Sequence, residues 1–165
     1  MLKSLFVTQT SETRSTDVEG VGSLRWEGSK LYRWVQNSTG EALVVGALVC
    51  YDPANAGAYH EKVEKPATAY IYNLAGVAMS AMPSDEYGWI LIFGQTDAVQ
   101  VWATNVNYGV GHTMKAKNGV FYAIETSASL PAAALPGYIQ LQEARDSTGP
   151  DTNVDLAGFV HCMNV

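Results

Sequence analysis

Short apolar segments alternate with polar turns along almost the whole chain, which is typical of β-strands joined by tight loops. Residues 24–27 and 30–35 flank a turn at Gly28, and this arrangement predicts a β-hairpin. Side chains alternate between the two faces of a strand, so Tyr32 and Trp34 are expected on the same face of the second strand. The pattern therefore indicates a hairpin with one aromatic face.

The segment 74–94 has the same organisation on a larger scale, with an apolar strand, a polar turn and a second apolar strand. Its only charged residues, Asp85 and Glu86, lie in the turn. Residues 89–93 are apolar on both faces, which predicts a strand that is central in a sheet or covered by another subunit. The segment indicates a scaffold and offers no reactive group.

Further strand-like segments follow at intervals of about 8–12 residues. They span 42–51, 68–72, 76–82, 88–93, 98–104, 112–116, 120–125, 138–142 and 156–163. The only candidate helix, 54–65, is weakened by Gly57, and the sequence shows no internal repeat. We therefore predict an all-β protein, a compact β-barrel or β-sandwich of about 8–10 short strands.

The first 22 residues differ from the rest of the chain. After a short apolar start they are rich in Thr, Ser, Glu and Gly and have no sustained period. We interpret residues 1–22 as an extended N-terminal arm, of the kind that is disordered or becomes ordered only against a partner. Residues 23–165 are then a single β-domain, because a chain of 165 residues can bury a core without metals or disulfides.

The composition narrows the classes of function. Charged residues make up 16% of the chain, below the roughly 25% usual for soluble domains, so its surface is largely uncharged and suited to packing against protein. The net charge of −6 and the scattered basic residues argue against binding of nucleic acid, which depends on Lys and Arg. No apolar run approaches the ~20 residues of a membrane helix. The apolar start is too short for a signal peptide, so we expect a chain used without secretion.

No arrangement of residues predicts a reactive centre. The three histidines, His60, His112 and His161, are isolated from one another, and no metal-binding spacing such as H-x-x-x-H or C-x-x-C occurs. The glycines of 109–111 are not followed by a helix, so a hairpin turn explains them better than a dinucleotide site. The acidic loop 146–155 lacks the spacing of a calcium-binding loop. We predict no catalytic residue, no metal and no cofactor.

The cysteines and tryptophans have structural explanations. Cys50 and Cys162 lie in apolar segments, which predicts buried free thiols; a disulfide is the alternative if their two strands are neighbours. Aromatic residues in strands usually belong to a core or a subunit interface. The alternative for the tryptophans is a carbohydrate-binding platform. They are Trp26, Trp34, Trp89 and Trp102.

The order of segments resembles the decoration, or cement, proteins of tailed-phage heads. In that family a flexible arm precedes a strand like 30–37 and a glycine-spaced segment like 40–46. A Gly-Val-Ala-x-Ser-x-Met block then precedes Tyr-Gly-Trp-Ile, matched here by 76–82 and 87–90. A closing Gly-Phe-Val strand is matched by 158–160. The resemblance covers about residues 20–165 loosely, through structural glycines and aromatics.

This resemblance implies a non-enzymatic virion protein on the capsid exterior, assembled in the host cytoplasm. Its expected partner is the major capsid protein, whose neighbouring subunits it would bridge, and self-association is expected as a homotrimer or a dimer. The arm and the loop 127–137 are the candidates for contacting coat subunits, since segments that order on binding can cover large surfaces. The predicted partner-binding residues are Leu2, Leu5, Phe6, Val7, Arg14, Leu130 and Leu135. The alternative is a β-sandwich module that binds carbohydrate or a receptor.

Overall fold

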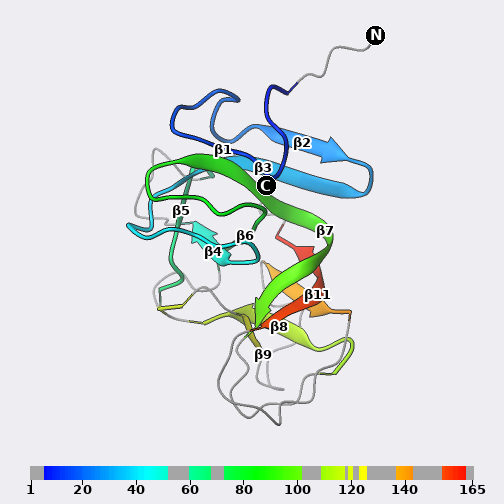
Figure 1. Cartoon of the computed structure of the whole chain (residues 1–165). Coiled ribbons are helices and arrows are strands. Elements are labelled where there is room, and N and C mark those ends of the chain that lie inside the picture. Colours follow the sequence, from blue (N-terminus) through cyan, green and yellow to red (C-terminus); the bar gives the residue numbers. More distant parts are fainter. Residues whose placement is uncertain are drawn as a thin grey trace.

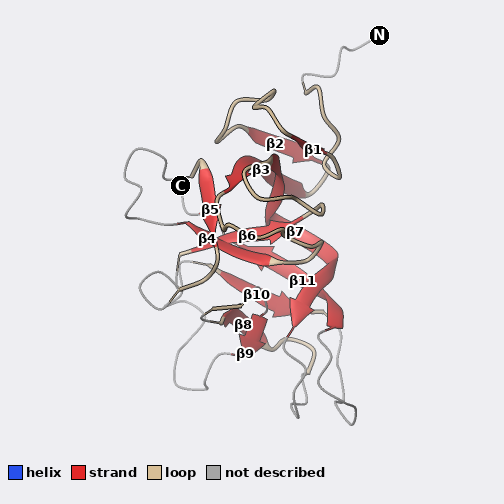
Figure 2. Cartoon of the chain, turned by 60° about the vertical axis from the view of Figure 1, so that its left-hand side comes forward, coloured by secondary structure: helices blue, strands red, loops and turns tan. Residues whose placement is uncertain are grey.

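The computed structural model describes residues 6–51, 60–67, 73–101, 109–117, 119–120, 123–125, 137–142 and 154–162. These residues contain no helix and are built from β-strands joined by turns and loops (Figure 2). The predicted all-β class is confirmed. No helix of the described part is long and apolar enough to cross a membrane.

Eleven strands are present in the described residues. They are β1 (Thr13–Arg14), β2 (Leu24–Glu27), β3 (Lys30–Asn37), β4 (Leu48–Tyr51), β5 (Lys62–Glu64), β6 (Leu74–Ala78), β7 (Tyr87–Val101), β8 (Thr113–Ala116), β9 (Ala123–Glu125), β10 (Tyr138–Leu141) and β11 (Val154–His161). Strand β5 occupies part of the candidate helix 54–65, and residues 54–59 lie outside the described part. All strands belong to one sheet of mixed direction, so barrel or sandwich describes it only loosely.

The pairings of this sheet trace two closed rings that share the long strand β7. The first ring runs β3, β5, β4, β6 and the first part of β7. The second runs from the later part of β7 through β9, β8, β10 and β11. Five strands cannot alternate direction all the way round a ring, so each ring contains one parallel pair, β3 with β5 and β7 with β9. Figure 1 shows β7 passing from the upper ring to the lower one.

The two rings have the same connectivity, shifted by four strands along the chain. Strands β3 to β7 of the first ring correspond to β7 to β11 of the second, and the register corresponds as well. Val49 lies opposite Gly76 in the first ring, as Met114 lies opposite Ile139 in the second. The chain therefore contains a structural repeat where the sequence shows none, because equivalent positions share backbone geometry and differ in side chain.

The turns before β4 and β8 show this equivalence in detail. Gly46 and Gly111 have nearly the same φ, 83° and 85°, in the left-handed region that favours glycine. The Gly46 N–H donates to the Ala78 carbonyl (2.9 Å), and the Gly111 N–H donates to the Leu141 carbonyl (2.8 Å). Ala78 and Leu141 each donate back to the carbonyl of the residue after the glycine, at 2.9 and 3.0 Å. One backbone motif thus begins the equivalent strand of each ring.

Strand β7 is one continuous element where the sequence predicted two strands, 88–93 and 98–104. Gln95 and Asp97 fall between the two predicted strands, and their polar side chains are exposed along β7 as it passes between the rings. The register slips within both of its long pairings, with β3 and with β11. The first part of β7 pairs with β3 and β6, and the later part pairs with β11 and β9. The two halves therefore have different surroundings, and their side-chain patterns look like those of two separate strands.

The core extends through both rings as one cluster of buried apolar residues. Its largest fully buried side chains are Trp34, Trp89, Tyr51, Leu43, Leu48, Leu74, Met82, Ile90, Leu91, Met114, Ile139 and Leu141. Residues 89–92 are buried on both faces of β7, as expected for the centre of a sheet. The two rings are therefore packed on a common core.

The segment 6–22 lies across β3 and β7, so most of the predicted arm is ordered against its own chain. Strand β1 pairs with the start of β7. The Trp89 indole N–H donates to the Thr8 hydroxyl (2.9 Å), and the Trp34 indole N–H donates to the Asp17 carboxylate (2.9 Å). A buried indole N–H needs a hydrogen-bond acceptor, and this segment supplies one for each of the two indoles.

Candidate functional surfaces

Five residues on one face of the sheet form a row that crosses five neighbouring strands in register. Trp26 on β2 lies opposite Leu31 on β3, and Leu31 lies opposite Phe93 on β7. Phe93 lies opposite His161 on β11, and His161 lies opposite Tyr138 on β10. We call these five residues the aromatic row.

The rings of the row contact one another from strand to strand. The Trp26 and Phe93 rings meet edge to face with centroids 6.2 Å apart, and the Phe93 and His161 rings do so at 5.9 Å. The His161 and Tyr138 rings are stacked at 5.1 Å. Phe159 packs beside Phe93 at 5.2 Å. Trp26 ends the row and is 60% exposed, so this face offers aromatic surface to a partner.

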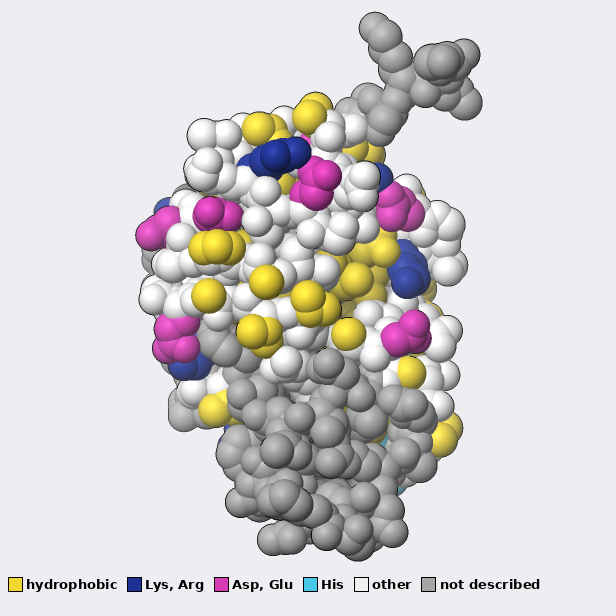
Figure 3. Space-filling model, viewed as in Figure 1, with side chains coloured by type: hydrophobic (Ala, Val, Ile, Leu, Met, Phe, Trp, Pro, Cys, Tyr) yellow, Lys and Arg dark blue, Asp and Glu magenta, His cyan; other side chains and the backbone are white. Residues whose placement is uncertain are grey.

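Other apolar side chains are exposed at separate turns. Val45 and Val110 occupy equivalent positions, each directly before the glycine that precedes β4 or β8, and they are 43% and 65% exposed. Val7 is 75% exposed. In Figure 3 the apolar side chains on the visible face are spread among uncharged polar surface, and the charged side chains are scattered. This surface suits contacts with protein at several points.

The described residues contain no pocket and no group of three or more potential metal ligands. His60, His112 and His161 lie in three different parts of the fold, and the structure does not bring them together as a set of ligands. The acidic loop 146–155 lies outside the described residues except for its last two positions.

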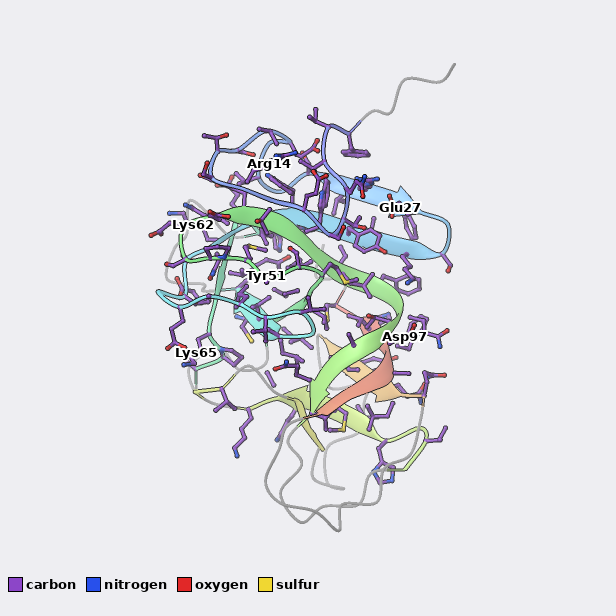
Figure 4. All side chains as sticks on the ribbon, in the orientation of Figure 1. Arg14, Glu27, Tyr51, Lys62, Lys65 and Asp97 are labelled. Atoms are coloured by element: carbon purple, nitrogen blue, oxygen red, sulfur yellow. The ribbon has the colours of Figure 1, made fainter. Side chains whose placement is uncertain are left out.

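A buried cation lies beside the first ring's β4. Arg33 is 6% exposed, and its guanidinium donates to the Tyr51 hydroxyl (2.9 Å) and lies 5.7 Å from the centre of the Tyr51 ring. Figure 4 labels Tyr51 in the interior of the molecule. Burial and the nearby Arg33 charge lower the pKa of His60, whose ring meets Tyr51 edge to face at 4.9 Å.

Both cysteines are buried free thiols. Burial raises the pKa of the Cys50 thiol to about 12. Burial also raises the pKa of the Cys162 thiol, and the neighbouring Cys50 adds to this rise. Neither thiol is a reactive nucleophile, because the thiolate is the reactive form.

Asn37, the first residue of a formal glycosylation sequon, is a structural residue. Its side chain is fully buried, and its amide N–H groups donate to the carbonyls of Glu41, Met82 and Pro83 at 2.8–3.0 Å. Its side-chain oxygen accepts from the N–H and hydroxyl of Thr39. The folded chain therefore holds this amide inside, between β3 and the turn before β7.

The predicted partner-binding residues are found in different situations. Leu2, Leu5, Leu130 and Leu135 lie outside the described residues. Phe6 packs edge to face on Trp89 at 5.5 Å and lies under the Arg25 guanidinium, so it contacts its own chain. Val7 and Arg14 are exposed, with Arg14 paired to Glu12 at 2.9 Å. Sequence reasoning missed Trp26 as a surface residue, although its place beside a hairpin turn was a signal.

Comparison of the chain with models of protein families, with curated proteins and with solved structures finds no match.

Proposed function

We propose that this chain is a non-enzymatic virion protein that binds the outer surface of a phage capsid and bridges neighbouring major capsid protein subunits. The observation that carries the proposal is the set of apolar side chains exposed at separate points of a β-body that is poor in charge. Val110, in the turn before β8 of the second ring, is 65% exposed, and Trp26, on β2 at the edge beside the first ring, is 60% exposed. Separate apolar points on a body held by two rings fit contacts with flat protein surfaces better than capture of a small ligand.

The residues that resemble decoration proteins occupy positions that determine how β6 and β7 pack. A Cβ atom at Gly76 would lie 2.4 Å from the Leu91 carbonyl oxygen, so the two strands approach closely only with glycine there. Trp89 is fully buried and bonded to Thr8. The resemblance thus rests on residues with a folding role, which supports a shared scaffold with that class of protein.

Bridging is a physical route to a stronger shell. A protein that contacts several coat subunits adds interfaces that must be lost before those subunits separate, and its contacts reinforce one another. Self-association, as the trimer that the resemblance implies or as a dimer, would multiply the contacts further. The proposed location is the capsid exterior, with assembly in the host cytoplasm.

The proposal is tested on shells that carry the protein and on shells stripped of it. We expect the wild-type chain to raise the temperature at which shells release packaged DNA. A Val7→Ser, Val110→Ser double variant should raise it less, since two exposed apolar contacts are removed. Gln95→Ser, at an exposed polar position, is the control and should act like wild type. A release temperature that no form of the protein changes would contradict the proposal.

The alternative function is binding of carbohydrate or a receptor, and the aromatic row is the observation that favours it. Exposed aromatic rings stack on sugars, and Trp26 is the exposed tryptophan of the described residues, whereas Trp34 and Trp89 are fully buried. The alternative predicts that oligosaccharides quench tryptophan fluorescence and that Trp26→Ala removes the quenching. An unchanged spectrum throughout the titration counts against it.

A further inference from the structure

Strand β2 has an open edge. It stands at the end of the strand order and pairs with β3 in the described part of the sheet. The backbone N–H of Trp34 donates to the Ser23 carbonyl (2.9 Å). Hydrogen-bonded and non-hydrogen-bonded pairs alternate along an antiparallel ladder, so the residues of β2 that bond to β3 are the odd-numbered ones, Arg25 and Glu27. The backbone N–H and C=O groups of Leu24 and Trp26 therefore point away from β3. No described residue makes a backbone hydrogen bond to them there.

The two side chains on one face of this edge are apolar and exposed to solvent. Leu24 and Trp26 lie on the same face and are 46% and 60% exposed. Natural edge strands usually carry charges, prolines or bulges that prevent pairing with another chain. Here the Arg25 guanidinium lies on the other face, 5.2 Å from the Phe6 ring and 5.6 Å from the Trp89 ring. The charge nearest the middle of the edge is thus held by the chain's own N-terminal segment, through the Thr8 carbonyl, and by an ion pair with Glu27 of the same strand.

The charges of β2 select one pairing with a second copy of itself. The outward groups of two β2 strands meet in an antiparallel arrangement about a two-fold axis. With the axis at Trp26, Arg25 of each copy lies opposite Glu27 of the other. With the axis at Leu24, neither Arg25 nor Glu27 lies opposite a charge. With the axis at Arg25 or at Glu27, two like charges lie opposite each other. Opposite charges in cross-strand pairs stabilise a sheet and like charges destabilise it, so the axis at Trp26 is favoured.

We propose that this chain forms a two-fold dimer in which the β2 edges pair, with Trp26 opposite Trp26 of the second copy. The aromatic row then continues from one chain into the other across a common sheet. Because both copies use the same edge, the interface closes at two copies. An interface of four-residue strands is small, so the dimer is weak and is populated mainly at high protein concentration. The proposal does not depend on capsid binding.

The test uses the purified full chain in sedimentation velocity, at concentrations from about 1 to about 500 μM, a range that covers weak dimers. Glu27→Lys puts like charges opposite each other at both Arg–Glu pairs, and it should weaken dimerisation about tenfold or more. Asp97→Lys is the matched control, since it makes the same charge change at an exposed site on β7 and should dimerise like wild type. Figure 4 labels both Glu27 and Asp97.

A backbone variant separates edge pairing from general charge effects. The Leu24 N–H points outward, so Leu24→Pro removes a donor that the chain itself does not use and should leave the β2–β3 hairpin folded. It should nevertheless abolish the dimer, because proline blocks the new strand pairing. Retained near-UV circular dichroism would show that the monomer is intact.

Several results would overturn the proposal. They are a wild-type chain that stays monomeric over the whole range, a trimer, and a dimer that neither variant weakens. A monomer whose binding to shells is lost in Glu27→Lys would also overturn it, because the edge would then pair with a coat strand. Failure of shell binding with an intact, Glu27-dependent dimer would instead count against the proposed function alone.

Discussion

The Trp89 indole N–H donates a hydrogen bond to the Thr8 hydroxyl at 2.9 Å, across 81 residues of sequence. The same hydroxyl donates to the Glu19 carboxylate at 2.6 Å, and Thr8 is only 3% exposed. This chain of bonds fastens the N-terminal segment to the strand that both rings share. The segment from residue 6 onward is thus part of the folded body, so deleting it would remove buried hydrogen bonds as well as any contact with a partner.

Thr8→Val should destabilise the fold by about 1–3 kcal/mol, because valine keeps the shape of threonine and leaves the buried indole N–H without an acceptor. Chemical denaturation followed by tryptophan fluorescence measures the change. Thr16→Val, at an exposed position, is the control and should lie within about 0.5 kcal/mol of wild type. Equal effects of the two variants would show that the bond does not hold the segment.

The equivalent turn glycines should respond differently to the same substitution. Gly46→Ala and Gly111→Ala both place alanine at a positive φ, which costs about 1–2 kcal/mol. A Cβ at Gly46 would also lie 2.7 Å from the Ala98 carbonyl oxygen, whereas a Cβ at Gly111 meets nothing within 4 Å. We expect Gly46→Ala to lower the free energy of unfolding by about 2 kcal/mol more than Gly111→Ala. Equal losses would contradict the close contact between the turn and β7.

Asn37→Asp should be one of the most damaging near-isosteric changes. It turns a carboxylate oxygen towards backbone carbonyl oxygens that now accept from the Asn37 amide, at a fully buried position. The expected loss is about 3 kcal/mol or more at neutral pH. It should shrink in acid, where a protonated carboxyl can donate again. Asn73→Asp, at a half-buried position, is the control and should show a much smaller loss.

His60 should make stability depend on pH. Burial and the nearby Arg33 lower the pKa of His60 below 6.5 in the folded chain. The unfolded chain then binds the proton more readily, so stability falls as the pH drops from about 6.5 towards the folded-state pKa. Replacing the side chain with His60→Gln should flatten the stability profile in that window. A profile as steep as that of wild type would mean that other groups cause the dependence.

The cysteines should be protected from alkylation. A thiol whose pKa is raised to about 12, as for Cys50, carries almost no thiolate near pH 8. Mass spectrometry after iodoacetamide treatment should find the native chain unmodified and the denatured chain modified at both cysteines. Rapid modification of the native chain would show that these strands open readily.

Local features of the fold can be predicted from the sequence, but the closing of the two rings of strands cannot. The hairpin at Gly28 and the alternation of Trp34 with its neighbours are short-range signals, and both strands lie where they were expected. The closing of each ring depends on parallel pairs between distant strands, β3 with β5 and β7 with β9, which leave no local pattern. The exposed polar side chains of Gln95 and Asp97 broke the apolar pattern inside what is one strand.

The candidate surfaces depend on contacts that the sequence does not display. The partner contact of Phe6 stays a prediction, but its segment lies on its own chain because the buried indoles of Trp34 and Trp89 need the acceptors that the segment carries. The aromatic row joins residues from five strands and exists only in the assembled register. The Val-Gly pairs at 45–46 and 110–111 lie at equivalent points of the two rings, but a match of two residues is too short to reveal a repeat in the sequence.

Co-sedimentation with assembled shells measures capsid binding itself. The purified full chain is mixed with stripped phage capsids of its host system and, separately, with unassembled major capsid protein. We expect the chain to sediment with the shells at a fixed ratio to coat subunits and not to bind the unassembled protein, because bridging needs neighbouring subunits. A chain that stays in the supernatant at saturating shell concentration would contradict the proposed capsid binding.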